Sequence, residues 1–171
     1  MAGLLRAGQA DLAMASSVLP GKDFVYSHLV RDEVLLGTRN NHPVGEHATW
    51  KENCAAPWVD INRVCNEDFA LLYPYQQTRV LSDALLLRER ITPNVCMQTR
   101  SVLTTIRLAS TGAAVCFAPW IGTRSYRFEE SPAFYSVGDP IYMDVNCVRL
   151  RGTEAGEELA VFMRLLADFS R

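Results

Sequence analysis

The stretch QTRSVLTTIRLASTGAAVCFAPW, from Gln98 to Trp120, decides the fold class. Ser101 can cap a helix, because a serine hydroxyl accepts a hydrogen bond from a free backbone N–H of the first helical turn. Gly112 is suited to end that helix. The apolar residues 113–118 then predict a buried strand, which Pro119 stops. This stretch therefore predicts a helix followed directly by a buried strand in the interior of a sheet.

The same alternation of elements continues on the N-terminal side of this stretch. Residues 69–73 (FALLY) and 94–98 predict two further strands. Between them, residues 79–91 predict a helix, because apolar side chains recur there at spacings of four, three and four. These side chains are Val80, Ala84, Leu87 and Ile91, and we expect them to pack against the sheet. Strands alternating with helices favour an α/β fold with a parallel, helix-covered sheet.

The two ends of the chain carry further elements. Residues 11–15 and 33–37 predict short strands, and residues 143–150 predict an extended segment. Residues 154–169 predict a closing helix with acidic residues near its start, where the helix dipole favours them. Residues 3–9 indicate the tail of a helix, so we expect that a preceding segment of a longer protein is missing here.

Composition narrows the class of protein. The 171 residues suffice for one domain or two small lobes, and 49% hydrophobic with 21% charged residues is typical of a globular chain. A net charge of −2 gives no basic face, so we do not expect this chain alone to hold DNA tightly. The five cysteines include no C-x-x-C pair, and no apolar run is long enough to cross a membrane. We therefore expect a protein of the reducing cytoplasm.

The sequence offers little catalytic chemistry. His28, His42 and His47 do not have the spacing of a metal site, and solvated loop positions explain them better. The chain contains no G-x-S-x-G nucleophile elbow, no P-loop and no G-x-G-x-x-G motif. We expect neither an enzyme, nor a metal, nor a cofactor.

The start of the helix at Ser101 has two possible interpretations, an anion site and an ordinary helix cap. Free backbone N–H groups at residues 101–104, together with the hydroxyls of Ser101, Thr104 and Thr105, would suit a carboxylate or a similar anion. The alternative is an ordinary capped helix in an α/β fold, and this stretch alone does not separate the two.

Four stretches, taken in order, resemble the effector-binding domain of LysR-type transcriptional regulators. They are residues 4–13 (LLRAGQADLA), residues 29–36 (LVRDEVLL) followed by His42-Pro43, residues 69–72 (FALL) followed by Arg79, and residues 101–119. The resemblance spans essentially the whole chain. It implies a two-lobed, type II periplasmic-binding-protein-like fold with helix-covered sheets. Residues 1–41 plus 144–171 would form lobe one, incomplete at its start, and residues 42–143 lobe two. The family's winged helix-turn-helix, which contacts DNA, lies outside this sequence.

The resemblance also implies a ligand site at the carboxyl ends of strands, in a cleft between the lobes. The residues expected to converge there are Ser16, Ser17, Thr38, Arg39, Tyr73, Arg100, Ser101, Thr104 and Thr105. Arg39 and Arg100 are the candidate charge partners of an acidic small-molecule effector. Ligand binding would change the lobe arrangement and, in the intact regulator, the geometry of a homodimer or homotetramer. Residues 79–91 match the lobe-two helix through which the family pairs.

Two other functions share this kind of scaffold. A solute-binding protein of a transport system would have the same fold, but the absence of a signal peptide and the odd number of cysteines disfavour it. An enzyme would need an acid–base pair in the cleft, and the sequence nominates none.

Overall fold

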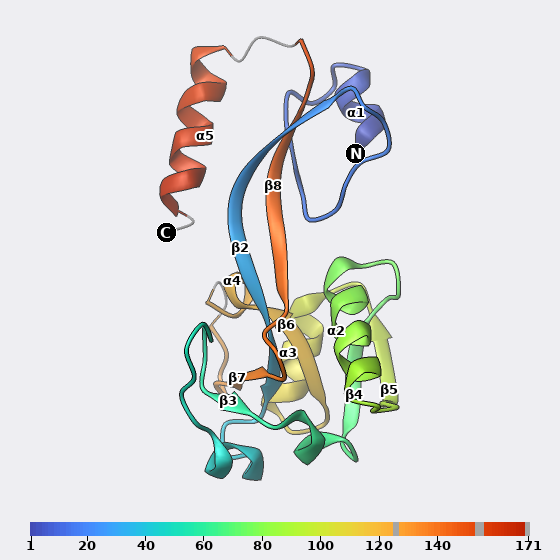
Figure 1. The fold of residues 1–171 in the computed structure, drawn as a ribbon, viewed down its shortest axis with the longest axis vertical. Helices are drawn as coiled ribbons and strands as arrows, with labels where there is room; N and C mark the ends of the chain where they lie inside the picture. The colour runs from blue at the N-terminus through green and yellow to red at the C-terminus, as the bar shows by residue number, and fades with distance from the viewer. Residues whose placement is uncertain (125–126, 153–155, 170–171) are drawn as a thin grey trace. The chain divides into compact units, whose positions relative to one another are not determined.

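A computed structural model describes residues 1–124, 127–152 and 156–169 (Figure 1). The chain divides into two compact units, the first made of residues 1–31 and 144–171 and the second of residues 32–143. Two strands, β2 (Phe24–Thr38) and β8 (Tyr142–Leu150), each contribute residues to both units. The sequence placed the first boundary after residue 41 rather than after residue 31. The difference arises because residues 34–38 of β2 pair with strands of the second unit.

The second unit is built on a sheet with the strand order β2-β6-β4-β5. Strands β4 (Asp68–Leu72), β5 (Asn94–Thr99) and β6 (Val115–Pro119) are parallel to one another. Strand β2 joins them antiparallel to β6, with Val34 opposite Pro119 and Gly37 opposite Cys116. Strand β7 (Ala133–Val137) continues the pairing antiparallel to β2 and is parallel to the short strand β3 (Trp58–Val59).

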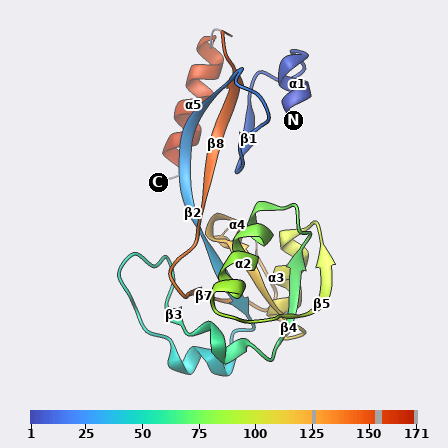
Figure 2. The ribbon, with the colours of Figure 1, turned by 45° about the vertical axis from the view of Figure 1, so that its right-hand side comes forward.

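Helices and turns cover both faces of this sheet (Figures 1 and 2). They are η1 (Pro43–His47), η2 (Ile61–Val64), α2 (Gln77–Arg88), α3 (Val102–Ser110) and α4 (Trp120–Arg124). Strand β6 shows why its run of apolar residues is unbroken. Val115 and Phe117 pack into the cluster that includes α2, whereas Cys116 and Ala118 pack into the cluster that includes α3. A strand covered on both faces needs apolar side chains at every position.

Cys116 behaves as a small buried hydrophobic side chain, as its position in the strand predicts. It is fully buried between β6 and α3. Burial raises the pKa of its thiol to about 12, although contacts with Thr105 and the backbone of Gly37 oppose that shift. The thiolate, which is the nucleophilic form, is therefore scarce at neutral pH.

Helix α2 packs with a different face from the one its periodicity indicates. The buried side chains are Thr78, Ser82, Leu85 and Leu86. Of the predicted face, Ile91 is buried beyond the end of the helix, but Val80 is 47% exposed and Leu87 is 79% exposed. The prediction that this face packs on the sheet was wrong, because the buried face combines Leu85 and Leu86 with two small polar residues. The Ser82 hydroxyl is satisfied there by donating to the carbonyl of Arg79, 3.0 Å away.

The first unit contains α1 (Ala2–Arg6), β1 (Ala13–Ala15) and α5 (Glu157–Phe169) besides its parts of β2 and β8. Strand β1 pairs antiparallel with β8, with Ala13 opposite Val148. A small core gathers Leu5, Ala15, Phe24 and Val148, and Arg6 makes two hydrogen bonds to the Asp23 carboxylate of 2.7 and 2.8 Å. The predicted closing helix is present from residue 157, and residues 154–155 lie outside the described residues. No helix in the described part of the chain is long and apolar enough to span a membrane.

Two neighbouring leucines of α2 test this packing. We expect Leu86→Ala to lower the free energy of unfolding by about 2–5 kcal/mol, because Leu86 is 2% exposed and its loss leaves a cavity. Leu87→Ala removes the same atoms from a surface position and should change stability by less than about 0.5 kcal/mol. Urea unfolding of both variants measures the difference. A larger loss for Leu87→Ala than for Leu86→Ala would show that the face with Leu87 is the buried one.

Candidate functional site

One end of the parallel sheet gathers most of the polar residues that the sequence singled out. Strands β4 and β5 run in the same direction with Leu72 opposite Thr99, so Tyr73 and Arg100 leave the sheet at the same edge. The Tyr73 N–H donates to the carbonyl of Thr99 at 3.1 Å, which ties the two strand ends together. Helices α2 and α3 begin just beyond, so their N-termini lie at this edge as well. We call it the α3 edge.

The N-terminus of α3 is built by Ser101. Its extended backbone (φ −102°, ψ 113°) places the hydroxyl to accept from the N–H of Thr104 at 3.2 Å. The Ser101 N–H in turn donates to the Thr99 hydroxyl at 3.2 Å. The N–H groups of Val102 and Leu103 find no acceptor among the described residues. These groups and the positive end of the helix dipole favour an anion at this point.

Arg100 supplies a cation beside this helix start. Its guanidinium carbon lies 5.9 Å from the centre of the Tyr73 ring, and Tyr73 stacks on Tyr75 with 5.9 Å between ring centres. Gln76 fixes the backbone on both sides. Its amide donates to the Arg100 carbonyl at 3.1 Å and accepts from the Tyr73 N–H at 3.2 Å. Sequence reasoning missed Tyr75, Gln76 and Thr99. Their position directly after or at the end of a predicted strand was the signal available.

The two threonines of α3 differ in what they can reach. Thr104 is half-buried in the first turn. Thr105 is completely buried, and its hydroxyl donates to the Val102 carbonyl at 2.8 Å. Helical periodicity places residue 105 on the face that packs against the sheet, so the expected ligand contact of Thr105 was wrong for its side chain. The exposed polar groups of the α3 edge are therefore those of Ser101, Thr104 and Arg100.

Thr38 and Arg39 lie at the opposite edge of the sheet. Because β2 is antiparallel to β6, its carboxyl end meets the amino ends of β4 and β6. Thr38 is completely buried, and its hydroxyl donates to the Arg39 carbonyl at 3.0 Å. The expected convergence of these two residues with Tyr73 and Ser101 was therefore wrong. The error came from treating β2 as parallel to the other strands.

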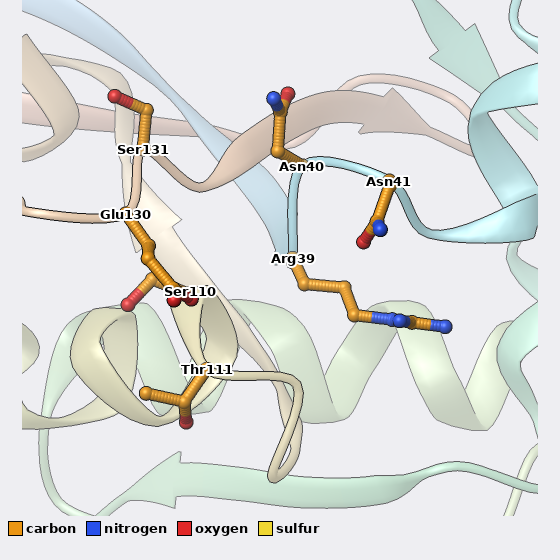
Figure 3. A pocket seen from close by; sticks show the side chains of 7 residues that line it. All are labelled: Arg39, Asn40, Asn41, Ser110, Thr111, Glu130 and Ser131. Carbon is orange, nitrogen blue, oxygen red and sulfur yellow. The ribbon is translucent and has the colours of Figure 1, made fainter.

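Arg39 instead lines a shallow polar hollow at that opposite edge (Figure 3). The lining residues are Arg39, Asn40, Asn41, Ser110, Thr111, Glu130 and Ser131. Gly112 makes room for the arginine stem, because a Cβ at Gly112 would lie 2.8 Å from Cδ of Arg39. Gly112 also has φ +77°, a conformation in which side chains are strained.

Ser16 and Ser17 belong to the other unit and follow the short strand β1. Ser17 is exposed and Ser16 is partly buried. Their participation in ligand binding stays a prediction.

Two buried carboxylates begin the second unit. Asp32 and Glu33 are each 3% exposed and follow one another on β2, so their side chains point to opposite sides of the strand. Asp32 accepts from the N–H of Ile121 in α4 at 3.1 Å, and Glu33 accepts from the N–H of Ala55 at 2.6 Å. The second carboxylate oxygen of Glu33 is buried with no hydrogen-bond partner among the described residues.

The histidines take part in local contacts. His42 accepts from the Val44 N–H at 3.2 Å and its other ring nitrogen lies 3.3 Å from the Glu67 carboxylate, so it caps η1. His28 lies 3.3 Å from Asp144. Within the described ranges, no three His, Cys, Asp or Glu side chains are grouped as a metal site would require.

The fold is that of an α/β domain whose parallel strands and helix N-termini meet at the α3 edge. The LysR substrate binding domain family model matches residues 1–171, and the chain belongs to this family. A curated relative, the uncharacterized HTH-type transcriptional regulator YybE of Bacillus subtilis (strain 168), is 22% identical over 115 residues. That match covers 67% of this chain and 36% of the relative, so the chain spans about a third of the relative's length.

Solved structures show the same fold. The effector binding domain of QuiR in complex with shikimate has a TM-score of 0.74 at 16% identity, over 99% of this chain and 76% of that chain. The Synechocystis PCC6803 CcmR regulatory domain in complex with 2-PG has a TM-score of 0.79 at 15% identity, over 99% and 78%. HinK of Pseudomonas aeruginosa, a LysR family regulator, has a TM-score of 0.78 at 14% identity, over 98% and 56%. The predicted α/β, two-lobed periplasmic-binding-protein-like fold and the LysR resemblance are thereby confirmed.

The cap of α3 can be tested by substitution. Ser101→Ala should lower the free energy of unfolding by about 1 kcal/mol, because the Thr104 N–H loses its acceptor. Ser101→Gly should cost only a few tenths of a kcal/mol, since glycine leaves room for water at the N-terminus. Thr104→Ala serves as the control and should cost less than Ser101→Ala. Chemical denaturation would refute the assignment if Ser101→Ala were as stable as the unaltered chain.

Proposed function

We propose that this LysR substrate-binding domain senses a small anionic effector, most simply a carboxylate, at the α3 edge. The observation that carries the proposal is the helix start at Ser101, where the free N–H groups of Val102 and Leu103 lie beside Arg100. Two solved relatives contain small molecules, shikimate in one and 2-PG in the other, which supports a small-molecule effector here.

Effector binding acts by favouring one conformation of the domain over another, because a ligand shifts an equilibrium only by its difference in affinity for the two states. In the intact regulator this shift would alter how a homodimer or homotetramer holds DNA. The DNA contact itself would come from a winged helix-turn-helix in a longer protein, since this chain has a net charge of −2. A regulator that acts on DNA in this way would work in the cytoplasm.

The proposal includes no catalysis. The α3 edge offers hydroxyls, backbone N–H groups and an arginine, which bind and orient an anion but do not form a nucleophile–base pair. A solute-binding protein of a transport system is the alternative on this fold, and the match to the LysR family over the whole chain disfavours it.

Ligand screening tests the effector site. Thermal unfolding should be monitored with a panel of small carboxylates that includes shikimate. A ligand at 100 times its dissociation constant adds about 2.7 kcal/mol, which raises the melting temperature of a chain of this size by about 5–10 °C. Arg100→Ala should remove most of the shift produced by any hit.

Arg39→Ala is the matched control for that experiment, because it removes the same charge from the opposite edge of the sheet. It should leave the shift intact. A shift that depends on Arg39 and not on Arg100 would move the effector site away from the α3 edge.

The outward face of α2 supports the homodimer. Val80 and Leu87 are exposed on this helix, and Met97 is exposed on the neighbouring edge strand β5. Apolar side chains exposed together on a helix and an adjoining sheet edge favour association with another protein surface. We assign this face to pairing between two copies of the chain, as the family resemblance implies for this helix.

Charge placed on this face should weaken the dimer. Val80→Glu/Leu87→Glu changes the net charge by −2 and would bury like charges at a twofold interface, so the sedimentation coefficient should fall toward that of a monomer. Arg107→Glu on α3 changes the net charge equally and should not alter the assembly. A dimer that survives the α2 substitutions at micromolar concentration would exclude this face.

A further inference from the structure

We infer that proton binding at Asp32, which lies beside the buried Glu33, regulates the affinity of the α3 edge for anions. This inference rests on the proposed anion site. Its basis is the position of two buried carboxylates at the same end of the sheet as Arg100 and Ser101. Val34 lies opposite Pro119 on β6, and Phe69 of β4 lies opposite Val115, which puts Tyr73 level with Pro119. Asp32, two residues before Val34, therefore belongs to the α3 edge.

The negative charge of the two carboxylates is poorly balanced by their surroundings. Each carboxylate has an N–H donor, from Ile121 for Asp32 and from Ala55 for Glu33, but no cation forms an ion pair with either among the residues that the structure describes. One oxygen of Glu33 is buried and unpaired. Burying a carboxylate without a cation beside it is costly, so the uncharged form of Asp32 gains relative stability.

The pKa of Asp32 agrees with this geometry. Burial raises it, and the nearby charge of Glu33 raises it further, whereas hydrogen bonds from the backbone N–H groups of Ile121 and Trp120 lower it. The segments that donate hydrogen bonds to the two carboxylates, residues 51–55 and α4, carry Lys51, Glu52, Cys54 and Arg124, and the strands β2 and β8 add Arg31 and Tyr142. Of these, Lys51 lies against the ring of Trp58, with its ammonium 3.0 Å from the ring centre.

The distance across the sheet sets how strongly the charge on Asp32 changes the affinity for an anion beside Arg100. Strand β2 is three steps from β5, and neighbouring strands lie about 4.8 Å apart, so a charge on Asp32 is about 14 Å from an anion beside Arg100. At an effective dielectric constant of about 20, that repulsion changes the affinity for a monovalent anion about sevenfold. An anion should therefore bind more tightly below the pKa of Asp32 than above it, and its binding should draw a proton onto Asp32.

Methanesulfonate is a suitable probe, because it stays a monoanion throughout the pH range used. Its affinity is measured at low ionic strength from the amide NMR shifts of Val102 and Leu103, from pH 4.5 to pH 8. The expected result is tighter binding at the acidic end than at pH 8, with an affinity that rises toward the sevenfold limit as Asp32 takes up its proton. Asp32→Asn, whose amide oxygen can still accept from Ile121, should bind tightly throughout and lose the pH dependence.

Asp139→Asn is the control, because this aspartate side chain is 92% exposed and contacts Arg88 near the far end of α2. It should keep the pH dependence. If Asp32→Asn does not fold, the carbon-13 shift of the Asp32 carboxyl in the unaltered chain gives the same answer, since saturating methanesulfonate should raise its pKa. Binding with a flat pH profile, or an Asp32 pKa that does not move, overturns this inference alone. Failure of methanesulfonate to shift Val102 and Leu103 at any pH overturns the proposed anion site as well.

Discussion

The arrangement of the larger unit depends on the antiparallel entry of β2 beside β6. A parallel sheet sends every carboxyl end to one edge, where helix N-termini with unpaired N–H groups also gather. Because β2 enters the other way, the first of its residues within this unit, Asp32 and Glu33, share that edge, and its last residues leave at the opposite one. One strand direction thus decides which polar groups can face a common ligand.

The direction of β2 also explains why two arginines that follow strands lie at opposite edges of the sheet. Arg100 follows β5 and lies beside the first turn of α3, with its carbonyl held by Gln76. Arg39 follows β2 and lies beside the last turn of α3, packed over Gly112. The two arginines occupy similar positions in the sequence, since each comes directly after a strand. Strand pairing alone puts Arg100 at the N-terminus of α3, where a cation can help to bind an anion. The same pairing puts Arg39 at the C-terminus of that helix.

Local sequence signals predicted α3 and β6 well, because each element has a single consistent pattern. Ser101 caps and Gly112 terminates the helix, and every residue of β6 from Val115 to Ala118 is buried. Helix α2 shows the limit of such signals. Val80 and Leu87 do form an apolar stripe, but periodicity does not say which partner covers it. In α2 that stripe faces outward, and Thr78 and Ser82 occupy the interior.

The residues of the α3 edge could be grouped from the sequence only where they are close in the chain or follow neighbouring parallel strands. Arg100, Ser101 and Thr104 come from one turn of chain, so their proximity follows from the strand-to-helix connection. Tyr73 joined them correctly because β4 and β5 are parallel neighbours, which the alternation of strands and helices implies. Asp32 could not be placed at this edge from the sequence, because its position there depends on the long-range register of Val34 against Pro119, which no local pattern encodes. The positive groups of the α3 edge, Arg100 and the helix start at Ser101, can therefore be found in one short stretch of sequence. The negative group, Asp32, comes near them only through the pairing of strands in the folded sheet.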